Sequence, residues 1–461
     1  RFCMVTGCQH CAEPPCVPVC PTGATWQRED GLVIQDYDVC IGCAYCAVSC
    51  PYQARTIAHD QRWYYGEETR QEIAVKHEER LGVAQKCTFC KDRVDAGVAK
   101  GLKPGVDPGP HFQLNAELGT DPQIKSLYTT PAIPGRPGGS AELDEERLSD
   151  PANPLVGPLQ TLWDWRAAMN WIFGGVASGF AAIAYLASLA GAVHADMVPS
   201  LHVVAAGLMA VGLFCVFLKI GRKLRFWRAA SRPQTSWMTR ELYVAAVLYP
   251  AILANLLWPS AVLSLLAGAL ALAFLWCQAK ILHRARGIPA WRVPLMPWML
   301  LATGLLEGTG LLALLLAWFR GLGQPGILAP VAGLALVAVN AALWIAYRRT
   351  AKAEGVVPLA RRVIGDNSLT LHLVGHVVPA VMFAAALANP GLISVYLGIA
   401  GVTAIAGGAF WKFTIIVRAG YQQGYAVPAV PQRGSGTRAA PPRVEGTALR
   451  GAPTRKKAAA A

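Results

Sequence analysis

Long apolar runs alternate with short polar segments through the second half of the chain. A helix needs about 20 apolar residues to cross a bilayer, and runs of roughly this length recur eight times. They span residues 171–193, 199–220, 241–258, 261–282, 294–319, 327–347, 370–388 and 392–417. The third run is short and is joined to the fourth by Pro259 and Ser260, so seven spans stay open as an alternative.

The rest of the chain has a different pattern. Residues 1–95 are polar and rich in cysteine, with short apolar runs typical of a small α+β domain. Residues 96–165 form an acidic linker rich in Gly and Pro, and residues 419–461 form a basic tail without periodicity, expected to be disordered. Residues 166–418 are predicted to be an all-α membrane bundle of about eight transmembrane helices.

Composition and charge agree with a multi-pass membrane protein. The 461 residues are 54% hydrophobic and 15% charged, which is too apolar for a soluble protein of this size. The basic excess lies in the membrane half and the tail, and the acidic residues lie mostly before residue 166. Positive charge that follows apolar segments argues against nucleic acid as a partner.

Lysine and arginine alternate between the predicted loops. The second, fourth and sixth loops are basic, whereas the odd loops contain only Arg320. Because positive loops stay on the cytoplasmic side, both ends of the chain are predicted to be cytoplasmic, in a bacterial inner membrane. The cysteine-rich domain would then lie inside the cell, where disulfides are rare.

Two cysteine runs carry the chemistry of the first domain. They are CQHCAEPPCVPVCP and CIGCAYCAVSCP, and the second has the spacing of bacterial two-cluster ferredoxins, in which the fourth cysteine ligates the other cluster. This spacing predicts two [4Fe-4S] clusters. One would be held by Cys8, Cys11, Cys16 and Cys50, and the other by Cys40, Cys43, Cys46 and Cys20. A pair of structural zinc sites is the alternative.

The first 95 residues resemble the iron-sulfur subunit of DMSO-reductase-type molybdopterin oxidoreductases. The resemblance lies in CQHCAEPPCVPVCPTGA, in REDGLVIQDYDVCIGCAYCAVSCPY and in KCTFCKDRVDAG. That family normally carries four clusters, but here the cysteine pair expected after Cys87 and Cys90 is missing. Cys87 and Cys90 therefore stay open as orphaned cluster ligands, a zinc half-site or reduced thiols.

Ionisable and polar residues inside the spans are candidates for quinone binding or proton transfer, because they are costly in lipid. These candidates are Glu307, His372, His376, Trp165 and Asn170. The alternatives are structural: a protonated Glu307 bonded to Asn255 or Asn340, packed histidines, and an aromatic belt for the tryptophans.

Three further charged residues are expected to have structural roles. Lys412 is expected to snorkel to the cytoplasmic interface, and Arg240 is expected to pair with Glu241. Neither expectation gives these residues a functional role.

The membrane half resembles the eight-helix anchors of polysulfide-reductase-like and DMSO-reductase-like enzymes, most clearly in TLWDWRAAMNW and SWMTRELY. The two resemblances imply an iron-sulfur subunit fused to its membrane anchor. Such a chain would pass electrons between a separate molybdopterin catalytic subunit and membrane quinone, without acting on an organic substrate itself. A redox-linked proton-translocating subunit and a haem b cytochrome are the alternatives, with haem disfavoured because His372 and His376 share one helix face.

Overall fold

The computed structural model describes residues 7–60, 69–70, 80–88, 91–99, 149–150, 156–324 and 326–423. These ranges hold most of the cysteine-rich domain and nearly all of the bundle. Cys90, most of the predicted linker 96–165 and most of the predicted tail 419–461 lie outside the described residues.

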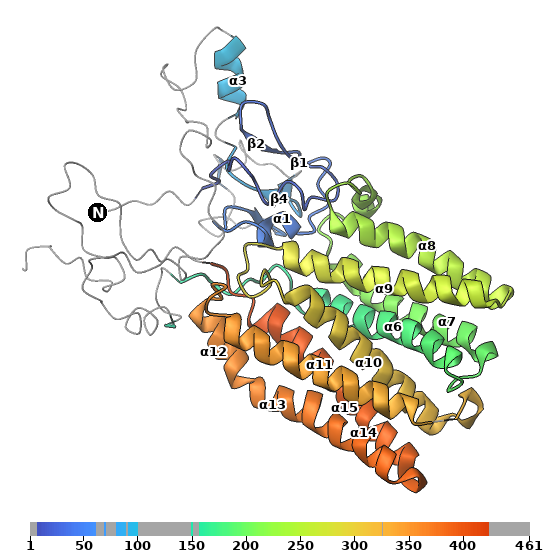
Figure 1. Cartoon of the computed structure of the whole chain (residues 1–461). Coiled ribbons are helices and arrows are strands. Elements are labelled where there is room, and N and C mark those ends of the chain that lie inside the picture. The colour runs from blue at the N-terminus through green and yellow to red at the C-terminus, as the bar shows by residue number, and fades with distance from the viewer. Residues whose placement is uncertain are drawn as a thin grey trace, which may run out of the picture.

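The cysteine-rich domain contains two short antiparallel sheets and little helix. β1 (Thr25–Gln27) pairs with β2 (Val33–Gln35), and β3 (Thr56–Ile57) pairs with β4 (Ala84–Gln85). α1 (Tyr45–Val48) is buried along its whole length. α3 (Lys91–Ala99) projects away from the sheets (Figure 1). A domain with so little regular structure depends on cross-links such as metal clusters.

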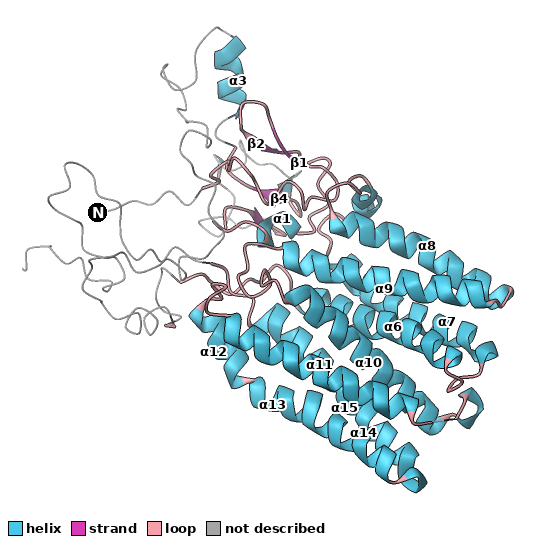
Figure 2. Ribbon diagram, in the orientation of Figure 1, coloured by secondary structure: helices cyan, strands magenta, loops and turns pink. Residues whose placement is uncertain are grey.

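Eight helices among the described residues are long and apolar enough to cross a membrane, which confirms the eight-span prediction (Figure 2). Six of them are single helices: α6 (Trp165–Leu189), α7 (Val198–Lys219), α8 (Trp237–Leu257), α9 (Ala261–Arg284), α10 (Met296–Trp318) and α11 (Leu328–Thr350). The third and fourth spans are separate helices joined at Pro259, so the seven-span alternative is wrong.

The last two spans are interrupted by π-helical turns. The seventh consists of α13 (Ser368–His372), η6 (Leu373–Val377) and α14 (Val378–Ala388). The eighth consists of α15 (Ile393–Phe413) and η8 (Thr414–Arg418), preceded by η7 (Pro390–Leu392). The remaining short helices are η3 (Ala195–Met197), η4 (Lys223–Ala230), η5 (Arg320–Leu322) and α12 (Pro358–Asp366). Turns of the π type often occur at functional sites.

The bundle has two halves that meet at α6 and α10. α7 and α9 pack against α6, and α8 packs on α7 and α9. In the other half, α11 and α15 pack against α10, and α14 packs on α11 and α15 (Figure 1). α6 and α10 are also the most buried of the eight spans. Their backbones approach closely because Gly179 lies against Gly304, where an added Cβ would be 1.8 Å from the Gly304 carbonyl oxygen. Such small-residue contacts are typical of packed membrane helices.

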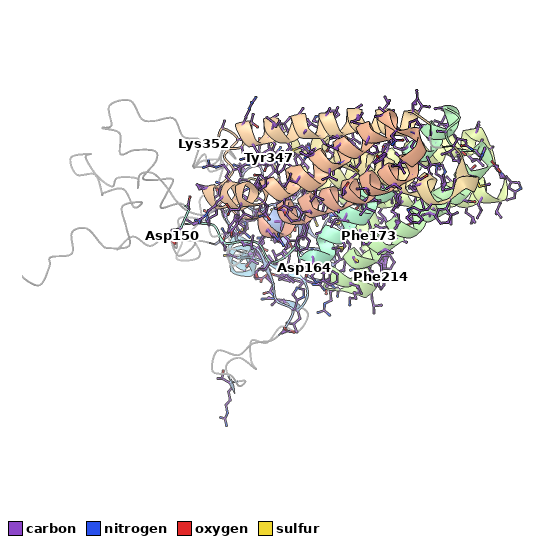
Figure 3. The ribbon with its side chains drawn as sticks, turned by 90° about the horizontal axis from the view of Figure 1, so that it is seen from below. Asp150, Asp164, Phe173, Phe214, Tyr347 and Lys352 are labelled. Carbon is purple, nitrogen blue, oxygen red and sulfur yellow. The ribbon has the colours of Figure 1, made fainter. Side chains whose placement is uncertain are left out.

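The cysteine-rich domain docks on one end of the bundle, at the start of α6. In Figure 3, Asp164 lies at this end, while Phe173 and Phe214 lie farther along the helices. The Arg222 amide donates to the Ile41 carbonyl (3.0 Å), and the Tyr45 hydroxyl donates to the Ile281 carbonyl (2.7 Å). The basic segment around η4, which the sequence used only to predict membrane orientation, therefore contacts the cysteine-rich domain directly.

Candidate functional site

Four cysteines from two separate stretches of chain line one cavity in the first domain. The cavity has about 290 Å³ of empty space. Its cysteines are Cys20, Cys40, Cys43 and Cys46. The backbone amides of Gly42 and Ala84 donate to the Cys40 sulfur, at 3.4 and 3.5 Å. Amides directed at sulfur stabilise thiolates, and in cluster proteins such hydrogen bonds tune the reduction potential.

The second set of cysteines lies close by. Cys16 is near enough to Cys50 and Cys8 for their charges to act on it. Burial, more than any neighbouring charge, raises the pKa of the Cys16 thiol to about 12. Without a metal the Cys16 thiol would stay protonated at neutral pH, because a buried thiolate needs positive charge for compensation. This donor set suits soft, multiply charged metal groups.

The spacing of the thiols distinguishes a cluster from a zinc ion. Among the described residues, no three His, Cys, Asp or Glu side chains are grouped as a single metal ion would require. A zinc ion draws four sulfurs to about 2.3 Å from one centre, whereas a cubane keeps them on its four corners, farther apart. Four cysteines that line one cavity without converging on a single point therefore fit a cubane better than a zinc ion.

His10 ties the first cysteine run to its surroundings. Burial and the nearby Lys86 lower the pKa of His10 to about 3, so the ring is neutral at pH 7. Its Nδ1 accepts from the Val33 amide (2.9 Å), and its Nε2 donates to the Cys87 carbonyl (3.2 Å). The Cys87 backbone is thus held beside the first run, while its side chain is exposed.

A second cavity lies between the docked domain and the bundle, with about 430 Å³ of empty space. Its wall includes Cys43, and so it adjoins the cavity of the four cysteines. α6, α7, α8 and α9 supply the other walls. We call it the cluster-side cavity. Besides Cys43, its principal lining residues are Trp163, Asn170, Trp171, Lys219 and Glu241.

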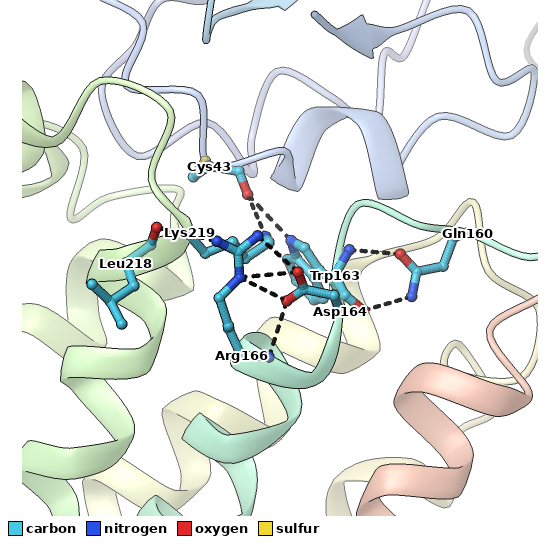
Figure 4. A network of polar contacts seen from close by, with 7 residues as sticks. All are labelled: Cys43, Gln160, Trp163, Asp164, Arg166, Leu218 and Lys219. Carbon is cyan, nitrogen blue, oxygen red and sulfur yellow. Dashed lines mark hydrogen bonds and ion pairs between the residues drawn. The ribbon is translucent and has the colours of Figure 1, made fainter. Parts of the chain in front are cut away.

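Two side chains of the bundle hold the peptide of Cys43. Trp163 Nε1 and Lys219 Nζ both donate to the Cys43 carbonyl, at 3.2 and 3.1 Å (Figure 4). Gln160 clamps the Trp163 backbone, accepting from its amide (2.7 Å) and donating to its carbonyl (2.8 Å). Trp163 is 2% exposed, so the aromatic-belt interpretation does not describe it. The contact made by Lys219 was not predicted from the sequence, in which Lys219 is only one of several basic residues of the second loop.

Figure 4 also shows how α6 begins. Asp164 caps the helix by accepting from the Arg166 amide (2.9 Å), and the Arg166 guanidinium returns to the same carboxylate (2.7 Å). The neighbouring Trp165 is 53% exposed and does not line the cluster-side cavity. Its position is that of an interfacial anchor.

Buried polar groups form the membrane end of the cluster-side cavity. Glu241, on α8, lies within hydrogen-bonding reach of the side chains of Asn170 and Gln278. Gln278 Nε2 donates to the Asn170 carbonyl at 2.9 Å. Asn170 Oδ1 and Glu241 Oε1 have no hydrogen-bond partner among the residues that the structure describes. The expected Glu241 pair with Arg240 is wrong, because Arg240 donates to the Pro233 and Gln234 carbonyls.

Glu307 forms an ion pair with Lys412 across α10 and α15. Lys412 Nζ and Glu307 Oε2 are 2.5 Å apart, and both side chains are fully buried. The expected partners were wrong: Asn255 bonds Ser264, and Asn340 bonds Thr303. Lys412 does not snorkel either. Removing one partner of such a pair leaves a buried charge without compensation and lowers the free energy of unfolding by about 3–5 kcal/mol.

His372 and His376 lie in the other half of the bundle, with ring centroids 5.2 Å apart. His376 lines a third cavity, with about 350 Å³ of empty space, which also includes Thr303, Asn340, Trp344 and Trp411. We call it the second-half cavity. His372 does not line it. The structure thus separates the predicted candidates: Asn170 lies at the cluster-side cavity, and His376 lies at the second-half cavity.

Comparison with protein families accounts for both parts of the chain. Residues 2–64 match the 4Fe-4S dicluster domain, and residues 162–357 match the DMSO reductase anchor subunit (DmsC). The chain joins a 4Fe-4S dicluster domain to a DmsC-type anchor domain. Both predicted resemblances are confirmed. The first match includes the cysteines of the four-cysteine cavity, the second includes most of the lining of the cluster-side cavity, and the second-half cavity extends beyond the second match.

Relatives of known name match the dicluster domain and some residues beyond it. A subunit of the anaerobic dimethyl sulfoxide reductase of Escherichia coli is 33% identical over 160 residues, covering 32% of this chain and 66% of that one. A subunit of the selenate reductase of Mesobacillus selenatarsenatis is 42% identical, covering 26% and 53%. A subunit of the tetrathionate reductase of Salmonella typhimurium is 46% identical, covering 20% and 28%. The chain therefore spans less than two thirds of each of these relatives.

Proposed function

We propose that the chain is the electron-transfer and membrane-anchor subunit of a molybdopterin oxidoreductase complex. Electrons would pass between a separate catalytic subunit and membrane quinone through two [4Fe-4S] clusters in the dicluster domain. Cys20, Cys40, Cys43 and Cys46 would hold the cluster nearer the anchor domain. Cys8, Cys11, Cys16 and Cys50 would hold the other. Cys87 and Cys90 receive no cluster in this proposal.

One observation carries the proposal: Cys43 lines both the four-cysteine cavity and the cluster-side cavity. A ligand in the cluster-side cavity would lie next to a cysteine of the nearer cluster. Trp163 and Lys219 fix the Cys43 peptide from the bundle side. Aromatic walls around two acceptor oxygens, Asn170 Oδ1 and Glu241 Oε1, suit a flat, mostly apolar ring with hydroxyl donors at its ends, such as a quinol.

The residues of the cluster-side cavity have distinct roles in this proposal. When bound, the clusters supply and accept single electrons. Trp163 and Trp171 pack against the ring, and Asn170 and Lys219 hydrogen-bond its oxygens. Glu241 exchanges the protons that accompany the two electrons, because it is the carboxylate at the cavity and one oxygen has no other partner.

The orientation follows the charge of the loops. We propose that the dicluster domain and the C-terminal tail lie on the cytoplasmic side of a bacterial inner membrane, because the basic loops lie on their side of the bundle. A protease-cleavable tag after residue 461 tests this in right-side-out vesicles. The tag should be protected, and cleavage in intact vesicles would reverse the orientation. No haem is included, since His372 and His376 share one helix face.

Photolabelling tests the position of the quinone. An azido-naphthoquinone irradiated with the full chain in nanodiscs should label peptides of α6 and α8, and excess unlabelled quinone should suppress the labelling. Labelling confined to α11 and α13, or labelling without competition, would contradict a quinone in the cluster-side cavity.

Arg55 is expected to set the potentials of both clusters. It is 5% exposed and donates to Gln35 (2.8 Å) and Thr25 (3.1 Å). The charges of cysteines from both sets, Cys16 and Cys46 foremost, act on it. A fixed positive charge stabilises the more negative, reduced cluster, so Arg55→Gln should lower the midpoint potentials.

Redox titration followed by EPR measures this effect. Arg55→Lys should lower the potentials less than Arg55→Gln, because it keeps the charge. Arg28→Gln is the matched control, since Arg28 lies at the surface in a pair with Asp95. Unchanged potentials in Arg55→Gln would remove Arg55 from this role.

A further inference from the structure

The second-half cavity contains buried polar atoms without protein partners. Trp344 and Trp411 are 4% and 3% exposed, and their indole Nε1 atoms have no acceptor. His376 Nδ1 is also unpartnered. Buried polar groups around a space of this kind are usually satisfied by ordered water. Thr303 and Asn340 add further polar groups to the wall, so the cavity is suited to hold water.

The Glu307–Lys412 pair adjoins this cavity. Gly408 lines the cavity, and a Cβ added to it would lie 2.2 Å from Glu307 Oε1. That same oxygen has no hydrogen-bond partner. One oxygen of the carboxylate therefore bonds Lys412, and the other is available on the side of the cavity wall.

The other side of the pair faces α6. A Cβ on Gly175 would lie 2.1 Å from Lys412 Nζ, so the ammonium rests directly on the helix backbone. A Cβ added to the adjacent Gly174 would lie 2.3 Å from Gln278 Nε2, so the Gln278 amide also rests directly on the backbone of α6. Gln278 belongs to the polar group of Glu241 and Asn170. The buried hydroxyl of Ser178, one turn along α6, has no partner in the protein.

The docked dicluster domain covers part of the cluster-side cavity. Cys43 and Ile41 are bonded to the bundle over its mouth, and Tyr45 reaches Ile281. Quinone chemistry in that cavity must nevertheless exchange protons as well as electrons. A sideways route through the bundle would meet this need.

We propose that Glu307 and Lys412 relay protons between the cluster-side cavity and a hydrated second-half cavity. The proposal rests on the proposed quinone chemistry and adds its proton route. A quinone that accepts two electrons must also take up two protons to become a quinol. Protons would enter from water in the second-half cavity, pass the pair, and reach the quinone oxygens through Glu241, with Gln278 as a hydrogen-bonding group beside this route. Quinol oxidation runs the same route in reverse.

The position of the second-half cavity sets the side of the membrane that supplies these protons. The cavity extends from the cluster-side ends of the helices, at Met299 near the start of α10 and Trp411 near the end of α15, to Leu306 midway along α10. The relay therefore starts and ends in the cluster-side half of the bundle and does not cross the membrane. It predicts proton exchange on the side of the dicluster domain, without proton pumping.

Stopped-flow mixing tests the relay in the full chain, with clusters loaded, in nanodiscs. Dithionite-reduced clusters, freed of excess reductant, are mixed with a short-chain naphthoquinone. Cluster absorbance reports electron transfer, and a pH-indicator dye reports proton uptake. Glu307→Gln and the double variant Glu307→Gln/Lys412→Met should both slow proton uptake at least about tenfold. The double variant strands no charge, and iron content confirms that each variant is folded and loaded.

Two further variants sharpen the result. Asn340→Leu, which replaces a polar group of the second-half cavity by an apolar one and so makes the cavity less able to hold water, should slow proton uptake in the same way, while quinone photolabelling of α6 is unchanged. Glu354→Gln, at an exposed carboxylate beyond α11, is the matched control and should behave like the unmodified chain. Proton uptake at the unmodified rate in the double variant would overturn the relay. Failure of the unmodified chain to oxidise its clusters with quinone would instead reject the proposed function.

Discussion

Cys46→Ser is expected to abolish electron transfer to quinone. Cys46 is 7% exposed, lines the four-cysteine cavity and lies beside Arg55. A serine hydroxyl is a poor substitute for a soft thiolate, so the cluster nearer the anchor domain should be lost or incomplete. The remaining cluster has no ligand at the cluster-side cavity. Quinone-dependent oxidation of the reduced protein should fall to background.

Iron and sulfide analysis under anaerobic conditions, combined with EPR, measures the loss directly. The unmodified chain should contain about eight irons, four per cluster, and Cys46→Ser should contain markedly fewer. Cys215→Ser is the matched control, because Cys215 lies in α7 and lines none of the three cavities. A full iron content with normal quinone reactivity in Cys46→Ser would refute the assigned ligands.

Asn170→Leu should reduce quinone turnover strongly and leave both clusters intact. Asn170 is 4% exposed, and its Oδ1 has no partner in the protein. Leucine has a similar volume but forms no hydrogen bond with a quinone oxygen or Glu241. Loss of a buried hydrogen bond worth about 1.5–3 kcal/mol corresponds to roughly a 10- to 100-fold lower rate.

Steady-state quinol assays and EPR separate the two parts of this prediction. The EPR spectra of Asn170→Leu should match those of the unmodified chain, while turnover falls. Asn389→Leu, exposed at the end of α14 far from the dicluster domain, should change neither. Normal turnover in Asn170→Leu would place the quinone elsewhere.

Local sequence patterns were sufficient to predict much of the fold. Span number follows from the length of apolar runs, since a bilayer imposes about 20 residues on each helix. The seventh span shows the limit: predicted as residues 370–388, it begins at Ser368 and contains a π-helical turn. Such a turn depends on packing against neighbouring helices, which a single sequence does not contain.

The candidate site was less predictable, because its contacts join distant parts of the chain. Glu307 and Lys412 are 105 residues apart, and the sequence did not predict that they would pair. Glu241 was paired with its neighbour Arg240, whereas the fold places it beside Asn170 and Gln278. Lys219 was interpreted only as a basic loop residue that indicates membrane orientation. The docked dicluster domain shows that it donates a hydrogen bond to the Cys43 carbonyl.

The most direct test of the account follows one electron from the Cys43 cluster to quinone. The full chain is reduced, freed of reductant, mixed with a short-chain naphthoquinone and freeze-quenched for EPR. We predict that the signals of both reduced clusters disappear within one turnover, and that Asn170→Leu delays their disappearance. An iron-free protein, or reduced clusters that quinone oxidises equally fast in both proteins, would contradict the account.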